Sequence, residues 1–147
     1  MEKIKSDFSQ KIEIITPDDE YHYFFAYYDM RATGDGINQN HLCHRVKFMD
    51  RIPTKDDVCE IGYLKDKKFY KIGETTAWNF QQGAMLQYHP FKENTVYYNV
   101  VKDGKFVTVT HNFETGEKSY TDMATACVSP NGKYGLSVNF GRIFAFR

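Results

Sequence analysis

The chain has 147 residues, and its 19 basic and 19 acidic side chains give a formal net charge of zero. That balance excludes a strongly basic nucleic-acid-binding protein and a polybasic protein of the membrane surface. Aromatic residues reach 16%, with 11 Tyr and 12 Phe. This composition favours strands, because flat and bulky side chains pack well on a pleated surface.

The compartment is predicted from the N-terminus and the cysteines. Residues 1–19 mix charged and apolar side chains without an apolar run or a small-residue cleavage site, so no secretory signal is expected. No stretch approaches the roughly 18 apolar residues of a membrane-spanning helix. Cys43, Cys59 and Cys127 are scattered and odd in number, which favours reduced, mostly buried thiols in a cytoplasmic protein.

The first group of strands is expected in the N-terminal half of the chain. Runs rich in Tyr, Phe, Val and Ile predict strands at Tyr23–Asp29, His41–Phe48, Glu60–Leu64 and Phe69–Gly73. Residues 49–57 are predicted to form a polar loop. That loop is either solvated or long enough to reach over the mouth of a central channel.

A second group follows the same pattern. Strands are predicted at Met85–Tyr88, Val96–Val101, Phe106–Asn112 and Lys118–Thr121, with turn residues between them. Helical periodicity is nearly absent from both groups. The chain is therefore predicted to be all-β, with about four short antiparallel strands in each group.

A third group begins near the C-terminus. Pro130, Asn131 and Gly132 supply the turn chemistry of a hairpin, with strands expected at Ala126–Val128 and Tyr134–Phe140. Pro90 in the second group and Pro130 in the third are 40 residues apart. Such a spacing predicts a structural repeat.

Four-stranded repeats of about 40–45 residues are typical of β-propeller blades. We therefore expect one partial propeller domain over residues 1–147, with two complete blades at about 21–77 and 78–124 and the start of a third at 125–147. A closed ring uses four to eight blades, which at this repeat length needs roughly 160 residues or more. The sequence thus predicts either a fragment of a longer protein or self-association that completes a ring.

Three segments carry a resemblance to a known group of proteins. Tyr21–Asp29, Trp78–Tyr88 and Val128–Tyr134 together resemble an uncharacterised group of bacterial β-propeller proteins related to TolB-like or WD40-like repeats and to oligogalacturonate lyases. The resemblance implies the propeller fold. In oligogalacturonate lyases a divalent metal is held by His and Gln side chains on later blades, so it implies no metal ligand and no catalytic residue within this chain.

Candidate ligand-binding residues follow from the expected positions of the innermost strands, which line a propeller channel. The two segments that lead into such strands offer aromatic, amide and carboxylate side chains, a combination that suits a sugar ring. Alternatively, the same residues seal the packing between blades. The predicted set is His22, Tyr27, Tyr28, Asp29, Trp78, Asn79, Gln81, Gln82 and Gln87.

Motifs for metal binding and catalysis are weak. His41, Cys43 and His44 are zinc-ligand types, but alternation along a strand points His44 away from the other two, so no metal or other cofactor is predicted. Arg45 in the same strand needs a partner if it is buried. The sequence has no nucleophile elbow, phosphate-binding loop or dinucleotide fingerprint, and it leaves catalytic residues unassigned.

Three function classes follow from these observations. The first is a non-catalytic propeller module that binds a ligand, such as a carbohydrate, at the mouth of the channel. The second is a fragment of a carbohydrate-active enzyme similar to oligogalacturonate lyases. The third is a protein-interaction scaffold. The expected partners are an oligosaccharide or a protein, with no nucleic acid and no membrane.

Overall fold

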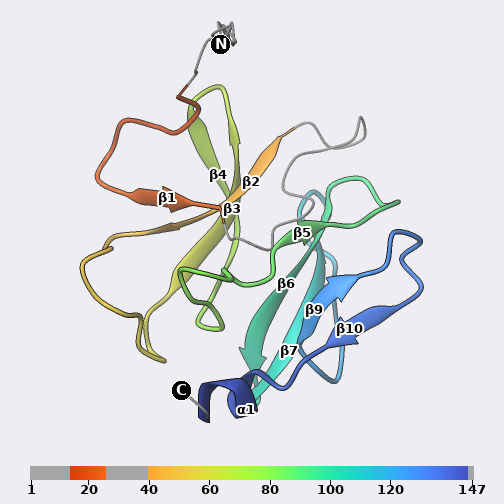
Figure 1. The fold of residues 1–147 in the computed structure, drawn as a ribbon. Coiled ribbons are helices and arrows are strands. Elements are labelled where there is room, and N and C mark those ends of the chain that lie inside the picture. The colour runs from red at the N-terminus through yellow and green to blue at the C-terminus, as the bar shows by residue number, and fades with distance from the viewer. Residues whose placement is uncertain (1–13, 26–39, 146–147) are drawn as a thin grey trace, which may run out of the picture.

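Two four-stranded antiparallel sheets and a hairpin make up the fold (Figure 1). The computed structural model describes residues 14–25 and 40–145. In each large sheet the strands lie side by side in chain order, which is the simplest antiparallel connection. The prediction of an all-β chain with groups of four antiparallel strands is confirmed.

The first sheet has the order β1-β2-β3-β4. Its strands are β1 His22–Phe24, β2 His41–Val46, β3 Cys59–Lys65 and β4 Lys68–Thr75. Asp66 and Lys67 form a two-residue turn between β3 and β4, and both have positive φ, as the twist of a tight hairpin requires. The predicted strand Tyr23–Asp29 is shorter in the structure because β1 ends at Phe24, while residues 26–29 lie outside the described ranges.

The second sheet repeats this arrangement with the order β5-β6-β7-β8. Its strands are β5 Gln87–Tyr88, β6 Thr95–Lys102, β7 Lys105–Asn112 and β8 Lys118–Tyr120. Asp103 and Gly104, again with positive φ, form the tight turn between the two long strands. The four predicted strands of this group are therefore present, although β5 is only two residues long.

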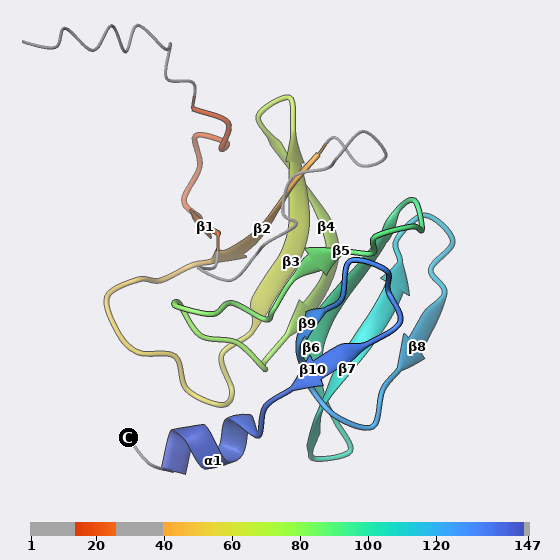
Figure 2. The same cartoon turned by 45° about the vertical axis from the view of Figure 1, so that its right-hand side comes forward.

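The hairpin of β9 Thr125–Val128 and β10 Gly135–Ser137 follows, and the helix α1 Phe140–Ala145 comes after it. The predicted strand Tyr134–Phe140 is wrong at its C-terminal end. The side chain of Asn139 accepts a hydrogen bond from the backbone N–H of Arg142 at 2.9 Å, which is the N-cap geometry that begins a helix. Figure 2 shows α1 at the end of the molecule where the long loop between β2 and β3 also lies.

One apolar cluster joins the two large sheets. Leu42 and Ile61 come from the first sheet, and Leu86, Val96 and Val109 come from the second sheet and the segment before it; all are essentially inaccessible to solvent. The sheets thus share a single core, which fixes the segment between β4 and β5 against the first sheet.

The two sheets approach each other closely at Gly73 on β4. A Cβ atom at this position would lie 2.5 Å from the hydroxyl oxygen of Tyr98 on β6. That separation is far below a van der Waals contact, so a larger residue at position 73 would force the Tyr98 side chain or the strand to shift. Thr75, at the end of β4, also donates a hydrogen bond from its hydroxyl to the Asn99 carbonyl at 2.7 Å.

All three cysteines are thiols. Cys43 and Cys59 are buried on adjacent strands, whereas Cys127 is exposed on β9, so the prediction of mostly buried thiols holds for two of the three. Burial raises the pKa of the Cys59 thiol. The described residues contain no helix with the length and apolar character that crossing a bilayer requires.

Candidate functional site

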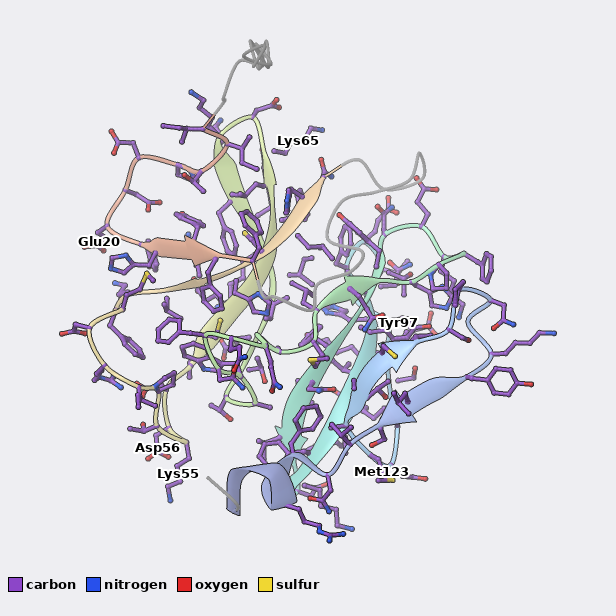
Figure 3. All side chains as sticks on the ribbon, in the orientation of Figure 1. Glu20, Lys55, Asp56, Lys65, Tyr97 and Met123 are labelled. Carbon is purple, nitrogen blue, oxygen red and sulfur yellow. The ribbon has the colours of Figure 1, made fainter. Side chains whose placement is uncertain are left out.

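A cavity of about 410 Å³ opens between the loop that follows β2, the segment that precedes β5, and α1. Its volume lies in the range of small-molecule sites. Figure 3 labels Lys55 on the loop, at the end of the molecule that α1 also occupies. The lining residues are Ile52, Pro53, Thr54, Lys55, Thr76, Ala77, Trp78, Asn79, Gln82, Gly83, Met85, Asn99, Phe106, Ala124, Phe140 and Gly141.

Asn79 organises the segment before β5. Its side-chain oxygen accepts hydrogen bonds from the backbone N–H groups of Gln81 at 3.0 Å and Gln82 at 2.7 Å. Backbone hydrogen bonds also join Asn79 and Gly83 in both directions, and Gly83 has a positive φ of 56°. This is a turn built on an asparagine side chain, and it holds the Gln82 side chain at the cavity.

Trp78 combines a packing role with a place in the cavity wall. Its indole N–H donates to the backbone carbonyl of Asp57 at 2.7 Å. Its ring packs edge-on against Phe80, with ring centroids 5.1 Å apart, and also contacts Phe24 and Phe48. Trp78 therefore packs against the loop and also lines the cavity, while its predicted contact with a ligand stays a prediction.

A loop closed by an ion pair also lines the cavity. The Asp57 carboxylate accepts hydrogen bonds from two nitrogens of the Arg51 guanidinium at 2.6 and 2.7 Å, and from the backbone N–H and hydroxyl of Thr54. The Arg51 guanidinium and then the Thr54 N–H hold the pKa of Asp57 well below its usual range. This closure presents Ile52 and Lys55 at the cavity, and Ile52 is 85% exposed.

Asn99 on β6 closes the back of the cavity. Its side-chain oxygen accepts from the Thr108 hydroxyl at 2.6 Å and from the Thr125 N–H at 3.2 Å, and its amide nitrogen donates to the Thr125 carbonyl. The polar groups of this buried amide are thus used to connect β6, β7 and β9. Asn99 is a structural residue at the cavity.

A matching connection joins the first sheet to the second. His44 on β2 is fully buried and stacks on Phe24, with centroids 5.0 Å apart. Its Nε2 accepts a hydrogen bond from the backbone N–H of Ala84 at 3.0 Å. In both large sheets, therefore, a buried polar side chain on the second strand accepts a hydrogen bond from a backbone N–H of the segment that begins the next sheet. The Thr125 N–H also donates to the Thr108 hydroxyl on β7, at 2.7 Å.

The predicted site residues divide into three groups. Trp78, Asn79 and Gln82 line the cavity. His22 is exposed on β1 opposite Val46, Gln81 is exposed beside the cavity, and Gln87 is buried with its amide donating to the Met85 carbonyl at 3.3 Å; none of these three lines it. Tyr27, Tyr28 and Asp29 lie outside the described residues.

Several cavity residues were not predicted. Met85, Phe106 and Phe140 are apolar residues that the strand pattern assigns to packing, and only the folded chain brings them together. Ile52–Lys55 belongs to the polar loop, which was predicted either to be solvated or to reach over the mouth of a channel, and not to line this cavity. The length of that loop was the one sequence signal that pointed to it.

Arg45 on β2 has the partner that the sequence analysis required for a buried charge. Arg45 forms an ion pair with Glu60 on the adjacent strand, and its guanidinium lies 4.0 Å from the ring centroid of Tyr21 and 4.2 Å from that of Phe69. Lys71 also pairs with Glu60 at 2.9 Å. Among the described residues, no three His, Cys, Asp or Glu side chains gather as a metal site would require.

Comparison of the chain with protein-family models, with curated proteins and with solved structures found no match.

Proposed function

We propose that this chain is a non-catalytic ligand-binding module of a β-propeller, and that a small ring compound occupies the cavity lined by Trp78. The observation that supports this proposal is the convergence of Trp78, Asn79 and Gln82 with Ile52–Lys55 on one cavity of about 410 Å³. Cavities of this size with an apolar lining and a few polar groups are the usual form of small-molecule sites.

The propeller assignment is supported by repeated local structure. Both large sheets are four-stranded meanders, and the connections made by His44 and Asn99 recur at matching places. The two turns 40 residues apart also touch, because a Cβ atom at Gly132 would lie 3.4 Å from Pro90. Contacts between equivalent turns are expected when successive blades stack around an axis.

The ligand class follows from the lining. Trp78 offers an aromatic surface, while the amides of Asn79 and Gln82 lie beside it on the same segment. A sugar ring suits such a site, since its C–H face packs on the aromatic ring and its hydroxyl groups form hydrogen bonds with amides. A carbohydrate therefore remains a proposed ligand, and a channel mouth remains the proposed location.

The fluorescence of Trp78, the only tryptophan in the chain, provides the test. We expect a saturable change in emission with at least one of glucose, glucuronate, phenylacetate and phenylacetamide. Gln82→Leu should weaken that binding about fivefold, as expected for one lost hydrogen bond. Gln81→Leu is the matched control, because the neighbouring amide is exposed and lies outside the cavity lining.

A flat response to all four compounds would contradict the proposed function. Equal losses of binding in Gln81→Leu and Gln82→Leu would contradict the placement of the site. The two other predicted functions, a lyase-like enzyme and a protein-interaction scaffold, stay predictions without a specific observation in their favour.

A further inference from the structure

Some polar groups of the cavity are already hydrogen-bonded within the protein, and others are not. The side-chain oxygen of Asn79 accepts two backbone N–H groups, and that of Gln82 accepts the Asn79 amide N–H at 3.2 Å. The oxygen of Asn99 accepts from Thr108 and Thr125. All three amide oxygens that line the cavity are therefore already engaged as acceptors.

Two hydrogen-bond donors of the cavity are not used by the described part of the protein. The Gln82 amide nitrogen makes no hydrogen bond within residues 14–25 and 40–145, and neither does the Lys55 ammonium group, which also has no ion pair there. Among the described residues, Lys55 is the single charged side chain of the lining and no carboxylate lines the cavity; Asp56 lies outside the lining, and Asp57 is engaged by Arg51. A ligand that supplies acceptors can therefore pair with both unused donors.

The remaining lining residues indicate that the rest of the ligand is apolar. Ile52, Trp78, Met85, Phe106 and Phe140 give the cavity a predominantly apolar wall. Because Ile52 is 85% exposed and Phe106 is 48% exposed, a ligand in the cavity would cover apolar surface that now faces water, and this burial favours binding.

We propose that the ligand is an organic carboxylate with an apolar ring, whose carboxylate is bound by Lys55 and the Gln82 amide nitrogen while its ring packs in the apolar part of the cavity. This inference rests on the proposed function and names the chemical class of its ligand. An ammonium group and an amide N–H are both donors to a carboxylate, and hydrogen bonds to a charged group are stronger than neutral ones.

The test compares phenylacetate with phenylacetamide, which have the same ring and nearly the same shape but differ in charge. Titrations followed by Trp78 emission should give phenylacetate about tenfold tighter binding than the amide, the size of one charge-assisted hydrogen bond. Lys55→Gln should remove most of that preference, because losing the charge weakens binding of the acid far more than binding of the neutral amide. Added salt should weaken the acid selectively, because Lys55 is exposed.

Lys92→Gln is the matched control, since Lys92 is an exposed lysine on the turn before β6 and does not line the cavity; it should bind both compounds as the wild type does. Equal affinity for acid and amide would overturn this inference and leave the proposed function standing. A preference for the acid that survives in Lys55→Gln would also overturn it. Failure of every ring compound to bind would overturn the proposed function as well.

Discussion

Acid should destabilise this protein through one buried histidine, His44. Burial lowers the pKa of His44 to about 4 in the folded chain, from an ordinary value of 6.5, and a backbone hydrogen bond to Phe24 acts in the opposite direction. Since Nε2 accepts the N–H of Ala84, the ring must stay neutral at that nitrogen for the hydrogen bond to persist. Protonation therefore opposes the link between the two sheets.

The sign and size of the effect follow from proton linkage. Below pH 6.5 the unfolded chain binds a proton at His44 that the folded chain does not, so the free energy of unfolding falls as the pH is lowered. The loss continues until the pH reaches the folded value of about 4. At 1.36 kcal/mol for each pKa unit, His44 alone accounts for a loss of about 3 kcal/mol.

Urea unfolding at a series of pH values, followed by Trp78 emission, measures this loss. The comparison is with His44→Gln, whose amide oxygen can still accept the Ala84 N–H but does not titrate. Between pH 6.5 and 4 the free energy of unfolding should fall more steeply for the wild type than for the variant. The difference between the two slopes against pH should correspond to nearly one bound proton. Parallel curves for the two proteins over this range would refute the reasoning.

The carboxylates whose pKa values are lowered in the folded chain, such as Glu60, act over a different range. Their stabilisation is present above their unfolded pKa and is lost as the pH falls through the lower folded value. Burial also lowers the pKa of His111, with a smaller contribution from Lys118. Because wild type and variant share all these groups, the difference between their curves isolates His44.

Three further predictions concern packing, the loop and the hairpin. Gly73→Ala should cost about 1–3 kcal/mol in chemical unfolding because its Cβ meets the Tyr98 hydroxyl, and Tyr98→Phe should recover part of that loss; no recovery would place the strain elsewhere. Asp57→Asn should weaken phenylacetate binding while changing the melting temperature little, since the carboxylate closes the loop that carries Lys55. Unchanged affinity would argue against a role for the loop. The chain should self-associate in light scattering, because β10 pairs only with β9 in the described residues and its Leu136 is 61% exposed; Leu136→Lys should reduce this, and a monomeric wild type would contradict it.

Much of the sheet structure could be predicted because its causes are local. Runs of Val, Tyr and Phe bounded by turn residues mark the strands of both large sheets, and the prediction places each group of four in the correct order. The helix at Phe140 was missed because a six-residue helix with two phenylalanines has the composition of a strand. Its one helix signal is the cap at Asn139.

The candidate site could be predicted only where one segment supplies it. Trp78, Asn79 and Gln82 lie on a single turn, so their composition already suggested binding. Gln87 was named for the same reason, but it lies on β5, where its amide is used by the Met85 carbonyl. Lys55 and Phe140 come from distant parts of the chain, and their place at the cavity depends on how the elements pack.

The connections made by His44 and Asn99 also bear on the order in which the chain assembles. The N–H of Ala84 obtains its side-chain acceptor from the second strand of the preceding sheet, and the N–H of Thr125 obtains its acceptors from the second and third strands. Each completed sheet thus supplies hydrogen-bond acceptors to the segment that begins the next sheet, and each sheet is stabilised mainly by contacts with its nearest neighbours. We expect assembly to proceed from the N-terminus toward the C-terminus, which is the direction in which a ribosome delivers the chain.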